Sequence, residues 1–109
     1  MYTILKKRTL GPAIREYEIE APEVARVARA GQFVVLRLHE RGERIPLTVV
    51  DCDPVHTGSV TVVVQEVGKS TREMGDRFHE GDRVMDFAGP LGEPSEIEPY
   101  GTVICIGGG

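Results

Sequence analysis

The sequence predicts an all-β domain, a small antiparallel barrel or sandwich. Apolar segments with strand character recur at short spacing, glycine- and proline-rich turns separate them, and a single segment carries a helix signal. The chain has 109 residues, a length typical of one domain. Hydrophobic residues make up 40% of it and Trp is absent, so we expect a core of Val, Ile and Leu.

The first predicted element is a hairpin, because the turn dipeptide Gly11-Pro12 separates two apolar runs. Residues 21–31 are predicted to be a looser connection and residues 53–58 a loop. The predicted strands are 2–10, 14–19, 33–38, 47–52, 60–67 and 83–88.

One helix is predicted after the fifth strand. Ser70 and Glu73 fit the capping box, in which each side chain satisfies a free backbone N–H at the helix start. We expect the helix to reach about Phe78 and the chain to turn at Gly81. The breaker-rich segment 89–94 is predicted to lead out of the barrel.

Charge and composition exclude several classes of partner. The net charge of −4 disfavours nucleic acid, which needs a basic surface, and no apolar run approaches the ~20 residues of a membrane span. The two cysteines and three histidines lack metal-type spacing, so no metal site is predicted. The apolar start precedes its basic cluster, unlike a secretory signal, and we expect a cytoplasmic protein.

Two short motifs carry the chemistry, residues 44–48 (Arg-Ile-Pro-Leu-Thr) and residues 68–71 (Gly-Lys-Ser-Thr). The second motif opens the predicted helix, where free N–H groups and the helix dipole attract an anion. Lys69 adds a positive charge, and the Ser70 and Thr71 hydroxyls can donate hydrogen bonds. A plain helix cap is the alternative, and it is compatible with anion binding. The spacing is not that of a Walker A loop.

The apolar run 102–106 leads into Gly107-Gly108-Gly109, the pattern that opens a nucleotide-binding βα unit. We therefore expect residues 1–99 to form the barrel and residues 100–109 to begin a second, nucleotide-binding domain, which the family resemblance given below implies to be the nicotinamide-nucleotide-binding domain. An apolar strand without cover has free edges, so we also expect self-association through this segment.

Together with Gly89-Pro90-Leu91-Gly92, these motifs resemble the FAD-binding domain of the ferredoxin–NADP reductase superfamily. Within it, the sequence is most similar to the electron-transfer subunits of dihydroorotate dehydrogenase and of NADH-dependent ferredoxin:NADP oxidoreductase, also called sulfide dehydrogenase. The resemblance implies a six-stranded antiparallel Greek-key barrel with one short capping helix and bound FAD.

The resemblance also implies roles for individual residues. Thr48 would lie beside the flavin N5 as the catalytic residue, with Pro46 and Leu47 along the ring and ribityl chain. Many relatives have an arginine for the pyrophosphate where this chain has Ile45, and Arg44 points to the opposite face of a strand. The pyrophosphate would instead meet the helix start. The full set of predicted FAD-binding residues is Ile45, Pro46, Leu47, Thr48, Val63, Val64, Gln65, Gly68, Lys69, Ser70 and Thr71.

These residues also have simpler interpretations, in which Arg44 is a solvated turn residue and Thr48 an ordinary strand threonine. The implied function is an FAD domain that passes electrons between NAD(P)H and iron–sulfur centres or ferredoxin, with a larger partner subunit. NAD(P)H and the iron–sulfur cluster are expected only in the full-length protein, and this chain alone is expected to be inactive.

Two other functions stay open. A flavin domain could serve another acceptor, such as an oxygenase or a nitrite reductase. A non-catalytic barrel module would belong to another class, but strand-binding barrels combine a basic groove with exposed aromatics, and this chain is acidic with three Phe, three Tyr and no Trp.

Overall fold

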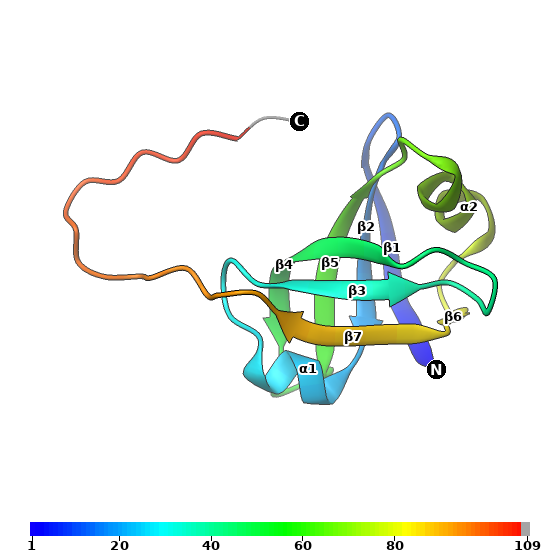
Figure 1. Cartoon of the computed structure of the whole chain (residues 1–109), viewed down its shortest axis with the longest axis horizontal. Coiled ribbons are helices and arrows are strands. Elements are labelled where there is room, and N and C mark those ends of the chain that lie inside the picture. Colours follow the sequence, from blue (N-terminus) through cyan, green and yellow to red (C-terminus); the bar gives the residue numbers. More distant parts are fainter. Residues whose placement is uncertain (108–109) are drawn as a thin grey trace.

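The computed structural model describes residues 1–107 and has seven antiparallel strands in a nearly closed barrel (Figure 1). The strand order is β6-β1-β2-β5-β4-β3-β7. The fold class predicted from the sequence is therefore confirmed. The strands are β1 (Tyr2–Gly11), β2 (Ile14–Glu20), β3 (Phe33–Arg37), β4 (Ile45–Asp53), β5 (Ser59–Gln65), β6 (Arg83–Val84) and β7 (Asp86–Leu91).

One interrupted strand closes the barrel. β6 pairs with β1 through Tyr2 and Val84, and β7 pairs with β3 through Leu36 and Phe87. Between β6 and β7, the Met85 N–H donates to the carbonyls at the end of β3 instead of continuing a ladder. The six strands predicted and the seven observed differ by this break. Joining the two edges of the sheet satisfies backbone groups that an open sheet would expose.

Alternation along the strands fills the interior with aliphatic side chains, as expected. Val60, Val62 and Val64 of β5 all point inward and are buried. The α2 helix (Lys69–Arg77) adds Met74, which is fully buried. The helix thus covers one end of the core.

A second helix was not predicted. Residues 21–31 contain α1 (Pro22–Val27), which covers the end of the barrel opposite α2 (Figure 1). Pro22 suits the first turn, where its missing N–H has no intrahelical partner to lose. Val24 and Ala25 are buried, so packing stabilises a helix too short to be stable alone.

The predicted capping pair at the start of α2 is wrong. The N-cap is Gly68, and Ser70 and Glu73 both lie inside the helix. Their side chains contact the loop between β3 and β4 instead, Ser70 with Glu43 and Glu73 with His39. Thr71 provides the local capping contact instead, since its hydroxyl oxygen accepts the Gly68 N–H at 3.0 Å.

The predicted exit segment is also partly wrong, because Gly89, Pro90 and Leu91 are the last residues of β7. The chain leaves the barrel at Gly92. Gln32 holds this exit in place. Its side-chain amide donates to the Gly92 carbonyl at 2.9 Å, and its backbone carbonyl accepts from the Val49 N–H of β4 at 3.0 Å. The Ser95 N–H adds a bond to the Ala30 carbonyl at 2.7 Å.

The described residues beyond this clamp extend away from the barrel without a helix or strand (Figure 1). Residues 102–106 form no strand here, and Val103, Ile104 and Ile106 are exposed. Gly108 and Gly109 of the predicted glycine turn lie outside the described residues. The second domain and the self-association remain predictions.

Neither helix in the described part of the chain has the length and apolar character needed to cross a membrane. Residues 1–107 also contain no cluster of three or more His, Cys, Asp or Glu side chains arranged to hold a metal ion.

Candidate functional site

The strands β4 and β5 separate on one side of the barrel. Their ladder runs from Val49–Val62 to Asp53–Ser59 and, within residues 1–107, does not extend to the start of β4. There β4 pairs with β3 alone, while the end of β5 pairs with β2 alone. Two strand edges therefore face a gap with backbone groups that are not used in a ladder between them.

A pocket of about 200 Å³ lies at the end of this gap. It joins the two motifs that the sequence singled out, the start of β4 and the start of α2. The lining residues are Glu43, Arg44, Ile45, Pro46, Val67, Gly68, Lys69, Ser70 and Thr71.

The side chains on the β4 edge alternate between the core and the outside. Ile45 and Leu47 pack against the core, while Pro46 and Thr48 are exposed. Thr48 thus presents its hydroxyl outside the barrel, as the predicted contact with a flavin requires. Leu47 does not share that face, so only its backbone can line a ligand next to Thr48.

The β5 edge has the same alternation. Val64 is buried at 1% exposure, so its side chain belongs to the core and only its backbone could meet a ligand. Val63 is half-buried and Gln65 is exposed. All eleven residues predicted from the sequence therefore lie along the gap or at the helix start, but the side chains of Ile45, Leu47 and Val64 pack toward the core.

The start of α2 offers unpaired donors. The first helical hydrogen bond runs from Arg72 N–H to Gly68 O at 3.0 Å, so the N–H groups of Lys69, Ser70 and Thr71 precede it. Thr71 stabilises the turn itself: its hydroxyl oxygen accepts from the N–H groups of Val67 at 3.1 Å and Gly68 at 3.0 Å. The Thr71 hydroxyl then donates to the Gly68 carbonyl at 3.1 Å.

Charges of both signs surround this helix start. Lys69 and Arg44 are exposed cations that line the pocket. Glu43 is the opposing charge, and its carboxylate accepts the Ser70 hydroxyl at 2.8 Å. The sequence prediction missed Arg44 as a pocket residue because strand alternation turned it away, and it missed Glu43 because no motif included it.

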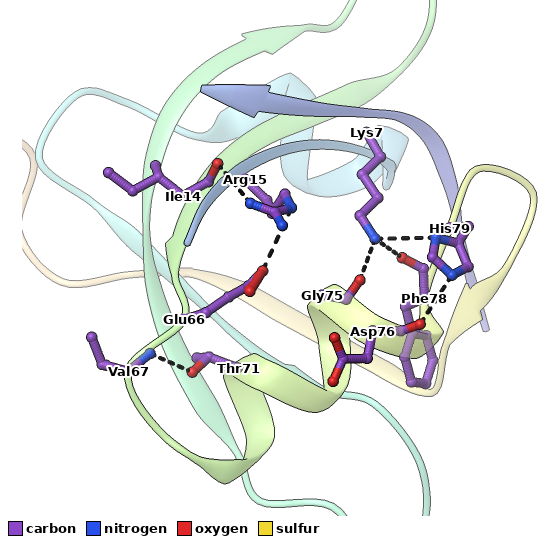
Figure 2. Close-up of polar contacts among 10 residues, drawn as sticks. All are labelled: Lys7, Ile14, Arg15, Glu66, Val67, Thr71, Gly75, Asp76, Phe78 and His79. Carbon is purple, nitrogen blue, oxygen red and sulfur yellow. Dashed lines mark hydrogen bonds and ion pairs between the residues drawn. The ribbon is translucent and has the colours of Figure 1, made fainter. Parts of the chain in front are cut away.

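Lys7 of β1 holds the other end of α2, as Figure 2 shows. Its ammonium donates to the carbonyls of Gly75 at 2.6 Å and Phe78 at 2.9 Å, and to His79 Nδ1 at 3.1 Å. These three bonds use all three protons of the ammonium. With Nδ1 as the acceptor, the His79 ring carries its proton on Nε2, which donates to the Asp76 carbonyl at 3.1 Å.

Burial is the main cause that lowers the pKa of Lys7, and the nearby Arg15 guanidinium adds to it. The carboxylates of Glu66, Asp76 and Asp82 oppose this shift. The positive charge is stabilised further by the helix C-terminus, where the dipole is negative. Lys7 therefore anchors the helix electrostatically as well as by hydrogen bonds.

The middle of α2 lies close to the side chain of Glu66. Glu66 follows β5 and forms an ion pair with Arg15 of β2 at 3.6 Å (Figure 2). A Cβ at Gly75 would contact the Glu66 carboxylate, so the glycine allows the helix to lie directly over it. Glu66 also affects Tyr17. Burial is the main cause that raises the pKa of the Tyr17 hydroxyl to about 12, and the Glu66 charge is the second cause.

The arrangement fits the pyrophosphate of FAD. An anion at the pocket would meet the three early N–H groups of α2, the Lys69 charge and the Ser70 hydroxyl, provided that Glu43 releases the last. The gap offers unpaired backbone groups and one exposed hydroxyl, Thr48, to the rest of a long ligand. These features suit a long ligand with an anionic group at one end.

Comparisons with known proteins bear on the family and the fold of the chain. No family model matches the chain. The chain is 51% identical over 106 residues to the "dihydroorotate dehydrogenase B (NAD(+)), electron transfer subunit homolog" of Thermotoga maritima, covering 97% of this chain and 37% of that protein. It is also 51% identical over 97 residues to an uncharacterized protein in the adh 3′ region of Clostridium beijerinckii, covering 89% and 32%.

Among solved structures, the NADH-dependent reduced ferredoxin-NADP oxidoreductase, studied for flavin-based electron bifurcation, superposes with a TM-score of 0.87 and 49% identity. That match covers 92% of this chain and 36% of the other. The Amycolatopsis cytochrome P450 reductase GcoB gives a TM-score of 0.70 at 25% identity, over 84% and 28%.

The chain spans about a third of the length of these relatives. High identity over almost the whole chain, combined with the same barrel, confirms the resemblance that the motifs indicated. The chain is homologous to parts of these proteins and shares the ferredoxin reductase-like barrel fold of the solved relatives.

Proposed function

We propose that this chain is the FAD-binding domain of an oxidoreductase subunit that passes electrons between NAD(P)H and iron–sulfur centres or ferredoxin. One observation carries the proposal: the two motifs singled out in the sequence line the same pocket, at the end of a gap in the barrel. The functions named for two of the relatives support the same assignment.

When bound, FAD would supply the exchange between two-electron and one-electron transfer. The protein's part is to bind and orient it. Lys69, with the early N–H groups of α2, would hold the pyrophosphate. Thr48 would direct its hydroxyl or backbone toward N5, and Pro46 keeps the neighbouring backbone fixed because its ring restricts φ.

The larger assembly is also part of this proposal. The relatives are about three times longer than the part that matches, which leaves room for a nicotinamide domain that would begin near residues 100–109. NAD(P)H, an iron–sulfur cluster and a larger partner subunit would belong to that complete protein. We propose a cytoplasmic setting, in keeping with two cysteines that are both free thiols.

A flavin domain that serves another acceptor is the second candidate. The fold similarity to a cytochrome P450 reductase favours it, at much lower identity than the ferredoxin-linked relative. Both candidates require FAD in the same pocket, so a test of FAD binding comes first.

The test compares FAD with riboflavin, which has the same ring but no phosphate. Titration of the 109-residue chain, followed by calorimetry or flavin fluorescence, should give measurable affinity for FAD. Lys69→Glu should weaken FAD binding by at least about tenfold and leave riboflavin unchanged, because it replaces an attractive charge at the pyrophosphate with a repulsive one.

Lys6→Glu is the matched control. Lys6 is also exposed but lies on β1, beside Arg8, Glu16 and Thr61 rather than at the pocket. The same change in net charge should leave FAD affinity almost unaltered there. Equal losses in both variants, or no FAD binding by the unmodified chain, would overturn the assignment.

A further inference from the structure

Glu43 occupies a position that the proposed flavin site does not explain. It lies in the loop before β4, next to Arg44, and lines the pocket with Lys69 and Ser70. Its carboxylate accepts the Ser70 hydroxyl at 2.8 Å, across a sequence separation of 27 residues. An acidic side chain therefore holds one of the donors at a site suited to an anion.

The same loop contacts α2 a second time. His39 Nε2 lies 3.0 Å from a carboxylate oxygen of Glu73, one turn further along the helix. With the Glu43–Ser70 bond, this contact places the loop against the helix at two points. The loop that carries Glu43 is thus held beside the helix start.

A carboxylate and a phosphate compete for the same partners. The Ser70 hydroxyl has one proton and can donate it to one acceptor at a time. A pyrophosphate that accepts the hydrogen bond from Ser70 must also approach the Glu43 charge. Like charges at short range repel each other. Lys69 would be attracted by both anions.

We propose that Glu43 is a built-in competitor of the phosphate at the start of α2, a residue that lowers the affinity for the phosphate-bearing cofactor. The inference rests on the proposed function. In this role Glu43 releases Ser70 when the pyrophosphate enters and takes it back when the pyrophosphate leaves. It tunes cofactor affinity without contacting the flavin ring.

The experiment measures FAD and riboflavin affinity for Glu43→Gln and Glu43→Ala in the 109-residue chain. Glu43→Gln removes the charge and keeps an acceptor for Ser70, while Glu43→Ala removes both. We expect FAD to bind about fivefold more tightly to Glu43→Gln, and at least as tightly to Glu43→Ala. Riboflavin affinity should not change, because riboflavin has no phosphate.

Glu40→Gln is the control, since Glu40 lies in the same loop, is exposed and does not line the pocket. It should change FAD affinity far less than Glu43→Gln does. Raising the salt concentration should narrow the difference between Glu43→Gln and the unmodified chain, because salt screens exposed charges.

The possible outcomes separate clearly. Weaker FAD binding by Glu43→Gln would overturn the proposal and make Glu43 a ligand, for example to a ribose hydroxyl. Equal effects at positions 40 and 43, or a matching change for riboflavin, would overturn it in favour of general surface charge or altered pocket shape. If the unmodified chain binds no FAD, the proposed function itself fails, whereas FAD binding that is insensitive to Glu43 removes only this inference.

Discussion

The two ends of α2 are built in opposite ways. At its C-terminal end, Lys7 of β1 donates to two backbone carbonyls and to His79. The protein itself therefore provides hydrogen-bond donors for the carbonyls at this end of the helix. At its N-terminal end, the residues before Arg72 line a pocket. Within residues 1–107, Thr71 accepts the Gly68 N–H there and Glu43 accepts the Ser70 hydroxyl.

The difference shows how a small barrel can present a helix N-terminus whose first N–H groups remain available to a ligand. A helix of nine residues is marginal without tertiary contacts, so one end must be fixed if the other is to remain available. The contacts at the closed end come from β1, and Arg15 with Glu66 adds support beside Gly75 (Figure 2). The closed end therefore holds the open end in position.

Lys7→Met should have the largest effect on this comparison. It removes three charge-assisted hydrogen bonds while keeping an apolar stem of similar length, and we expect stability to fall by about 2–3 kcal/mol. Chemical denaturation would measure the loss, and amide hydrogen exchange should accelerate in the last turn of α2. Lys6→Met, at the exposed neighbouring position, is the control, and an equal loss there would show that Lys7 does not anchor the helix.

Thr71→Ala tests the open end with a smaller expected effect. Its hydroxyl oxygen accepts two backbone N–H groups, so its loss should cost about 1 kcal/mol, as for other helix caps. Thr71→Ser keeps the hydroxyl and should restore most of the stability in the same denaturation experiment. If Thr71→Ser is as unstable as Thr71→Ala, the methyl group rather than the hydrogen bonds matters.

Thr48→Val tests the proposed flavin contact at the β4 edge, which lies away from both ends of α2. In the full-length subunit we expect FAD to remain bound and hydride transfer from NAD(P)H to slow, because one oriented hydrogen bond contributes about 0.5–1.5 kcal/mol. Stopped-flow reduction of the flavin measures the rate. An unchanged rate would exclude a role for the hydroxyl, although a backbone contact would survive the change.

Tyr17→Phe should have the smallest effect at neutral pH, within about 0.5 kcal/mol, because the Tyr17 hydroxyl is buried without a hydrogen-bond partner among residues 1–107. At high pH the two proteins should differ. The pKa of Tyr17 is raised to about 12, from 10.0, so between these values the unfolded chain loses a proton that the folded chain keeps.

Stability from this residue is therefore complete below about pH 10 and declines as the pH rises toward 12. Denaturation at stepped pH should show the decline in the unmodified chain and a shallower decline in Tyr17→Phe. Tyrosinate absorbance gives an independent check, since one phenol should ionise last. Parallel curves for the two proteins would contradict the shifted pKa.

The sequence predicted what local pattern controls. Alternation located the strands, and the two motifs predicted site residues that the fold brings to one gap. Contacts between segments that are far apart in the chain could not be predicted from local pattern. Ser70 and Glu73 have the right spacing for a capping box, but Glu43 and His39 engage them, and nothing local indicates that competition.

The same reason explains the other differences. Met85 looks like any strand residue, yet its N–H bonds to the end of β3 and divides the last strand. Lys7 is one of three consecutive basic residues, and only the path of β1 past α2 distinguishes it from its neighbours. Local pattern identifies elements and motifs, while their long-range partners depend on the assembled barrel.

Gln32 connects two parts of the barrel by hydrogen bonds: the β4 edge that carries Thr48 and the end of β7, where the chain leaves the barrel. Its backbone carbonyl is bonded to Val49, next to Thr48, and its side chain to Gly92, where the chain leaves β7. Gly31 lies so close to Ser95 that a Cβ there would stand 2.8 Å from the Ser95 backbone nitrogen, which leaves no slack in the clamp. The position of the segment after Gly92 is therefore coupled by hydrogen bonds through Gln32 to the strand edge beside Thr48.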